Sequence, residues 1–154
     1  MTPAANPVRL AATARLTAGD GAAALLAAGV GAGDSRPPGA GGVTTSPDDA
    51  PAFPYVEVQG TTEVEGLRSD RTRSSSVTLT LVCRSTSRAE VEAVARVVTE
   101  LLGRRFALGG ELQMTGASVD LYGPAYRENP PGARPWSLPV RLRYTVYQSA
   151  DPGE

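Results

Sequence analysis

A chain of 154 residues can form one domain with a buried core, and its net charge of −1 argues against a general basic surface for nucleic acid. All 15 basic residues are Arg and His is absent, which removes the side chain that titrates near neutral pH and the commonest nitrogen ligand of zinc. The single cysteine, Cys83, excludes an internal disulfide. It ends an apolar alternating run, so we expect a small buried hydrophobe and not a reactive thiol.

The N-terminal region predicts two helices. Asn6 suits an N-cap and is followed by Pro, a residue favoured at the first helical position, which predicts a helix over residues 7–17. Glycines around position 20 should end this helix, and a short Ala- and Leu-rich helix is expected over residues 22–28. Residues 29–52 are rich in Gly, Pro, Ser and Asp without periodicity, which predicts a long loop.

Two strands are expected next. Residues 53–59 combine aromatic and β-branched side chains, and residues 77–84 alternate strictly between apolar and polar side chains. Between them, residues 60–76 are polar and predict a second long loop. Four charged residues of this loop are candidates for contacts with another subunit: Arg68, Asp70, Arg71 and Arg73.

The clearest helix signal lies over residues 87–102. Ser87 followed by Glu90 fits a capping box, and apolar residues then recur at helical spacing from Val91 to Leu102. The opposite side of this helix carries charged residues at i, i+4 spacing, which we expect to face solvent or a partner: Glu92, Arg96 and Glu100.

The last strands are predicted over residues 111–122 and 138–148. A change in the parity of the apolar positions at Gly116 predicts a bulge in the first of them. The connection over residues 123–137 contains Trp136, which would act either as a plug over the core or as an anchor in an interface. Residues 149–154 are expected to form a flexible tail. No stretch is as long and apolar as a membrane helix, so we expect a soluble protein of the cytoplasm that has no membrane partner.

The pattern predicts a single α+β domain over residues 1–154. Its elements would follow the order α(α)-β-β-α-β-β, with a mostly antiparallel, four-stranded sheet, helices on one face and long polar loops. A search for catalytic groups leaves only adjacent Asp48 and Asp49 in a loop and the serines of 74–76, which lack a base. We therefore expect no enzyme, no cofactor and no metal, but a protein that makes protein–protein contacts.

Several segments resemble the tail-terminator, or tail-completion, proteins of long-tailed phages and gene-transfer agents. The first two helices are similar to those of the family, and the segment Asp49–Val56 resembles its entry into the first strand. The strand around Leu79–Leu81 with the helix that follows it, and the last strand at Leu142–Tyr144, fit the same order. The family usually has an aromatic residue where this chain has Cys83.

This resemblance implies a structural protein of the virion, located at the head-proximal end of the tail and assembled in the host cytoplasm. It implies a ring of six copies that caps the tail tube, stops its polymerisation and joins it to the head connector. The partners would be further copies of the chain, the tail tube protein and a head-closure protein, without sequence-specific nucleic acid. Two alternatives remain: a regulatory module that binds a small molecule on a ferredoxin-like sheet, and a neighbouring head-closure or adaptor protein of the neck.

Overall fold

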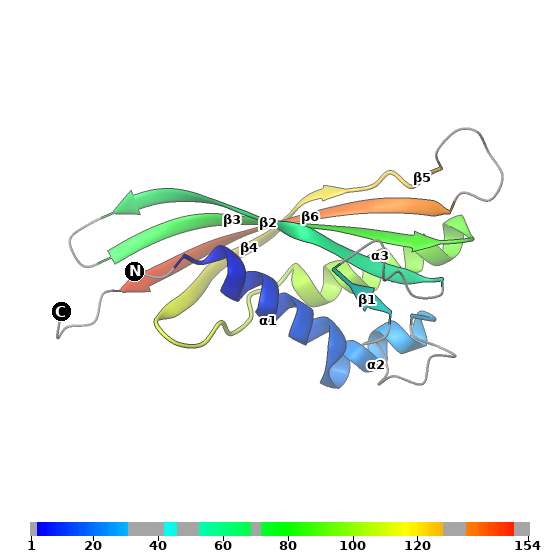
Figure 1. Cartoon of the computed structure of the whole chain (residues 1–154), viewed down its shortest axis with the longest axis horizontal. Coiled ribbons are helices and arrows are strands. Elements are labelled where there is room, and N and C mark those ends of the chain that lie inside the picture. Colours follow the sequence, from blue (N-terminus) through cyan, green and yellow to red (C-terminus); the bar gives the residue numbers. More distant parts are fainter. Residues whose placement is uncertain (1–2, 31–41, 46–52, 69–71, 128–134, 150–154) are drawn as a thin grey trace.

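In the computed structural model, three helices lie against one face of a long, twisted sheet (Figure 1). The structure describes residues 3–30, 42–45, 53–68, 72–127 and 135–149. The helices are α1 (Ala5–Thr17), α2 (Gly19–Ala27) and α3 (Arg88–Leu102). The strands are β1 (Val43–Thr44), β2 (Tyr55–Arg68), β3 (Thr72–Ser85), β4 (Leu112–Tyr122), β5 (Tyr126–Arg127) and β6 (Trp136–Ser149). The predicted α+β class is confirmed.

The predicted count of four strands is wrong, because the described residues form six. The sheet has the order β1-β2-β3-β6-β4, and β5 pairs with β6. Only β1 and β2 run parallel among these pairs; the others are antiparallel. β1 and β5 have two residues each, too few for an alternating pattern, and both lie within segments that the Gly and Pro content marked as loops.

The predicted loop over residues 60–76 is also wrong. β2 and β3 pair from Tyr55 and Arg84 as far as Arg68 and Arg73, so only residues 69–71 separate the two strands in the sequence. The missed part of the hairpin contains Thr, Ser and charged residues on both faces, so it has no alternation of apolar and polar positions. The β-branched residues nevertheless suit an extended backbone.

The core lies between the helices and the inner face of the sheet, which is the face that they cover. Its strand residues are the apolar sets that the alternation predicted, such as Val77, Leu79 and Leu81 in β3 and Val140, Leu142 and Tyr144 in β6. α3 buries its predicted stripe, with Leu101 half-buried at the margin: Val91, Val94, Ala95, Val98 and Leu102.

β4 contains the predicted bulge and a second one. Its register against β6 shifts between Met114 and Gly116, as the parity change indicated, and again between Val119 and Leu121. The second shift means that Leu121 pairs with Arg141 on the outer face of the sheet. Regular alternation after the Gly116 bulge would place Leu121 on the same face as Val119. The second bulge reverses this, because a single extra residue changes the direction of every later side chain.

The first helix begins earlier than predicted and uses a different cap. The N-cap position is Ala4, and Asn6 lies inside α1, where its side chain accepts a hydrogen bond from Arg9. The backbone N–H groups of Ala4 and Ala5 instead donate to the carboxylate of Glu63 in β2, at 2.9 and 3.2 Å. A carboxylate at this place also interacts favourably with the helix dipole.

The glycines around position 20 do not separate the two helices, because α2 already starts at Gly19. α1 ends at Thr17, and Ala18 alone links the helices in an extended conformation. A Cβ at Gly21 would lie 1.8 Å from the carbonyl oxygen of Arg15. Gly21 therefore allows α2 to pack closely against the end of α1.

Both ends of α3 are held by side chains. At the start, the Ser87 hydroxyl accepts from the N–H of Glu90, as expected for the cap. At the end, Arg15 of α1 donates to the carbonyl of Leu101, and the hydroxyl of Tyr144 donates to that of Leu102 at 2.6 Å. These donors satisfy carbonyl groups that a helix leaves without intrahelical partners.

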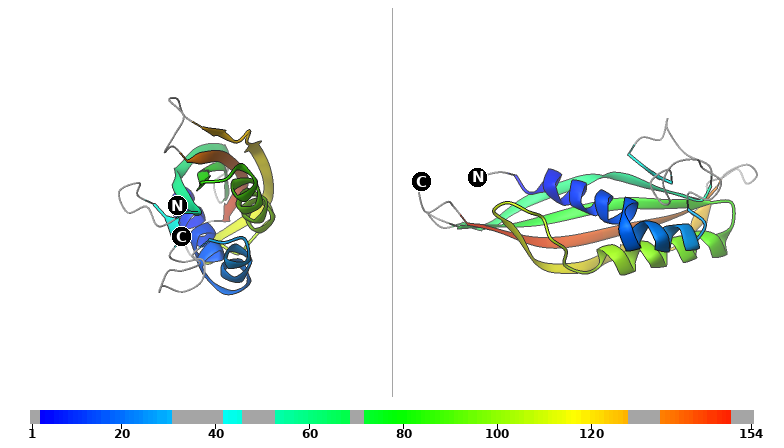
Figure 2. Two further views of the ribbon diagram at one scale, coloured as in Figure 1. Left: turned by 90° about the vertical axis from the view of Figure 1, so that its right-hand side faces the viewer. Right: turned by 90° about the horizontal axis from the view of Figure 1, so that it is seen from below.

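The paired ends of β2 and β3 extend beyond the start of α1 (Figure 2). We call residues 64–68 and 72–76 the hairpin arm. On its inner face, polar side chains form the boundary with the apolar core. Arg73 lies 3.9 Å from Glu63 and donates a hydrogen bond to Gln148 at 2.9 Å. The hairpin arm thus continues the sheet where the apolar core ends.

We predict that Glu63→Ala lowers the free energy of unfolding by about 1–2 kcal/mol, because it removes the cap of α1 and the partner of Arg73. Glu63→Gln retains one acceptor oxygen and should lose less. Urea denaturation followed by circular dichroism measures both changes. Glu100→Ala, at an exposed position of α3, is the matched control and should change the stability by less than about 0.5 kcal/mol. Equal losses in the two alanine variants would contradict the capping role.

Candidate interaction surfaces

The predicted contact residues lie in two separate parts of the molecule. Arg68 and Arg73 belong to the hairpin arm, whereas Trp136 begins β6 at the opposite end of the sheet, where α3 also starts and Arg88 lies beside both Glu92 and Trp136. Trp136 and Gln148, the β6 partner of Arg73, are 12 residues apart in one strand, which corresponds to roughly 40 Å. The predicted residues therefore do not form one site.

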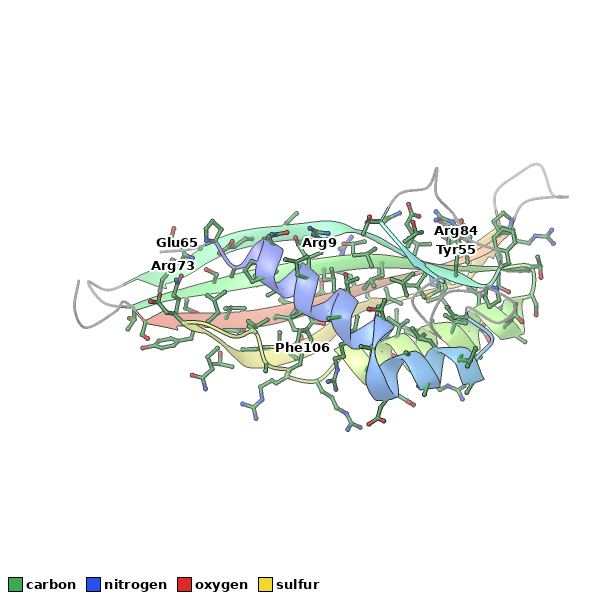
Figure 3. The ribbon with its side chains drawn as sticks, turned by 60° about the horizontal axis from the view of Figure 1, so that its bottom comes forward. Arg9, Tyr55, Glu65, Arg73, Arg84 and Phe106 are labelled. Carbon is green, nitrogen blue, oxygen red and sulfur yellow. The ribbon has the colours of Figure 1, made fainter. Side chains whose placement is uncertain are left out.

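The hairpin arm has less free charge than the sequence indicated. Figure 3 shows Arg73 and Glu65 on neighbouring strands at this end. Arg73 is partly buried between Glu63 and Gln148, so its replacement would disturb the fold as well as any contact. Arg68 ends β2, whereas Asp70 and Arg71 lie outside the described residues. Their part in a contact stays a prediction.

The polar side of α3 is open to solvent. Arg96 and Glu100 are exposed, and Glu92 forms an ion pair with Arg88 at 3.1 Å instead of with Arg96. Tyr122 of β4 reaches this helix, and its hydroxyl lies 3.4 Å from the carbonyl oxygen of Glu92. Burial raises the pKa of Tyr122, although the charge of Arg96 acts in the opposite direction. This side of α3 can contact another chain without any rearrangement of the core.

Trp136 is part of β6 and not of a loop, which corrects the predicted connection over residues 123–137. It pairs with Ser85 and with Arg127 of β5, is half-buried and packs against the core. The guanidinium groups of Arg88 and Arg127 lie 5.7 and 5.5 Å from the centre of its ring, within the range of cation–π contacts. These contacts favour the plug over the core, while Tyr126 beside it is exposed.

The outer face of the sheet, opposite the helices, is a further large surface. At the end near Trp136 it holds Arg84 and Tyr55 (Figure 3). Arg84 pairs with the buried Glu57, and Tyr55 stacks on Phe53 with ring centres 5.3 Å apart. Toward the other end Val64 is an exposed apolar residue, and most of the exposed side chains are polar: Thr62, Ser118, Arg141, Arg143, Thr145 and Tyr147. The alternation of apolar and polar residues in β6 predicts that its polar residues share one face. Which residues of the other strands lie beside them depends on the strand order.

The described residues offer little for a small ligand. A hollow of about 710 Å³ lies along the turn between α3 and β4, but its polar side chains, Arg104, Arg105 and Gln113, are exposed and do not converge. A second hollow of about 470 Å³ is lined by Arg15, which is already bonded to Leu101. No three His, Cys, Asp or Glu side chains gather as a metal site in the described part of the chain. None of its helices has the length and apolar character needed to cross a membrane.

The fold is similar to that of one chain in a solved structure described as "Virion of native gene transfer agent (GTA) particle". The TM-score is 0.66 at 16% sequence identity, and the similarity covers 90% of this chain and 93% of the other. No family model matches the sequence, and no curated protein matches it. At this identity the comparison establishes a shared fold over nearly the whole length of both chains.

Cys83 is fully buried, and desolvation raises the pKa of its thiol to about 12. We predict that the native protein does not react with Ellman's reagent until it unfolds.

The raised pKa of Cys83 also makes the stability depend on pH. In the unfolded chain the thiol has its ordinary pKa of about 8.5, so between pH ~9 and ~12 the unfolded chain loses this proton and the folded protein keeps it. The free energy of unfolding therefore falls as the pH rises through this range. Between pH 8 and 10 the wild type should lose about 2 kcal/mol more than Cys83→Ala in urea denaturation. Equal losses would contradict the burial of the thiol.

Proposed function

We propose that this chain is a structural protein of a virion and, more specifically, a tail terminator. Its copies would form a ring, with six subunits as the family resemblance implies, on the last ring of the tail tube. The ring would stop tube polymerisation and bind the head connector. The observation that carries this proposal is the similarity of fold to a chain of a gene transfer agent particle over 90% of the present chain.

The distribution of candidate surfaces supports this role. A terminator must contact a copy on each side, the tube below and the connector above, so it needs several separate surfaces and no deep pocket. The hairpin arm at one end of the sheet, the polar side of α3 with Trp136 at the other end, and the outer face of the sheet offer several surfaces of this kind. The shallow, exposed hollows give little support to the regulatory module.

The direct test combines the purified protein with tail tubes of the particle from which the chain comes. Negative-stain electron microscopy should show ring-shaped caps at one end of each tube, and assembly reactions without the protein should give tubes of uncontrolled length. When the protein carries a tag, a label bound to this tag on complete particles should lie between the tail and the head. Binding to the head connector without capping of tubes would contradict the terminator and favour a head-closure or adaptor protein.

We predict that Arg96→Ala weakens capping of tubes while the fold stays intact. Arg96 is exposed on α3, so its removal should change the free energy of unfolding by no more than about 0.5 kcal/mol. The fraction of capped tubes at limiting protein concentration measures the contact. Arg9→Ala is the matched control, because Arg9 lies on α1 (Figure 3) and its side chain makes only a local hydrogen bond, to Asn6, among the described contacts. Equal capping by both variants would exclude this part of α3 from the contact.

A further inference from the structure

Among the described strands, β2 and β4 each leave one edge of the sheet without a partner strand. β1 pairs with β2 only through Val56 and Glu57, and no described strand pairs with the outer edge of β2 over residues 60–68. Likewise, no described strand pairs with the outer edge of β4 over residues 112–122. Such edges present backbone N–H and C=O groups that can pair with another strand. Neither segment contains Pro, and the parts that would pair, residues 60–65 of β2 and 116–119 of β4, lie between the bulges of their strands.

The directions of these two strands are opposite. β2 is antiparallel to β3, β3 to β6 and β6 to β4, so three reversals separate β2 from β4. A second copy placed beside the first in the same orientation would therefore bring its β2 against β4 in antiparallel pairing. This contact is head-to-tail, so it repeats from copy to copy and can close into a ring.

The two open edges also lie at the same level of the sheet. Thr62 pairs with Thr78, Thr78 with Arg143 and Arg143 with Ser118. Thr62 and Ser118 therefore lie on one line across the strands, both on the outer face, and both are exposed. Adjacent copies need no shift along the strand direction to place these two residues opposite one another.

Charge also distinguishes the possible pairs of edges. The open part of β2 carries Glu63 and Glu65, and the one charged residue of β4, Asp120, lies 3.5 Å from Arg143. With Thr62 opposite Ser118 in antiparallel pairing, Glu63 lies opposite the uncharged Ala117, whereas pairing of two β2 edges would bring their carboxylates together. Like charges on adjacent strands are destabilising, so this arrangement favours contact between unlike edges.

We propose that a second copy of this chain occupies each edge, with β4 of one subunit paired antiparallel to residues 60–68 of β2 in the next. This proposal rests on the ring of the proposed function and names the contact that closes it. The sheet would then continue from subunit to subunit, and backbone hydrogen bonds would supply much of the contact.

Disulfide trapping tests this pairing, because the one native cysteine, Cys83, is buried. The double variant Thr62→Cys with Ser118→Cys should give, after oxidation at high protein concentration, a non-reducing ladder that continues beyond the dimer to the closed ring. Val64→Cys with Ser118→Cys detects a register shifted by two residues. Circular dichroism checks that these exposed substitutions leave the fold unchanged.

The control is Thr61→Cys with Ser118→Cys. Thr61 is the neighbour of Thr62 but pairs with Leu79 on the inner face, so the two sulfurs would lie on opposite sides of the sheet. This variant should give at least tenfold less product. A ladder from the control as well, or no ladder from either outer-face pair, would overturn the pairing. A dimer from Thr62→Cys or Ser118→Cys alone, without a longer ladder from the double variant, would overturn the head-to-tail arrangement.

Electron microscopy of the same variants, oxidised in the presence of tail tubes, separates this inference from the proposed function. Rings without disulfide products would retain the terminator and overturn the edge pairing. A full ladder that forms open filaments would support the edge pairing and contradict the ring. Without rings and without a ladder, both proposals fail.

Discussion

A strand of 14 residues rises about 46 Å, whereas the 15 residues of α3 rise only about 22 Å. Helices on one face therefore leave part of each long strand without an apolar partner. Where that cover ends, Glu63 binds the first N–H groups of α1, and Arg73 and Gln148 close the inner face. Beyond this boundary the hairpin arm adds no residue to the apolar core, so its side chains can be polar on both faces of the sheet.

This mismatch explains which parts of the fold the sequence predicted. Burial on one face imposes alternation in residues 77–84 and 138–148 and a helical stripe from Val91 to Leu102, so these elements were found. The hairpin arm contributes no apolar residue to the core, although Ser75 is buried, so its polar sequence predicts a loop. The first helix cap was missed for a different reason, since Glu63 lies 59 residues from Ala4 in the sequence. Only the pairing of strands brings them together.

The candidate surfaces show the same limit. Exposure of Arg96 and Glu100 followed from local helical spacing, and the Gly116 bulge followed from local parity. The second bulge in β4 is not marked by a change in the parity of apolar residues in the sequence, although it turns Leu121 to the outer face of the sheet. The open edges of β2 and β4 could not be located from the sequence, because an edge is defined by the strands that are absent beside it. That property belongs to the strand order, which depends on contacts between distant segments.

The proposed contact between strand edges would depend little on individual side chains. At 16% identity over 90% of the chain, the pattern of buried and exposed positions can persist while most individual side chains differ. A site built from particular side chains would require those residues to be kept. Backbone N–H and C=O groups are present at every non-proline position, so pairing between β2 and β4 needs only the strand order and direction. An assembly contact of this kind depends on the fold itself more than on any single residue.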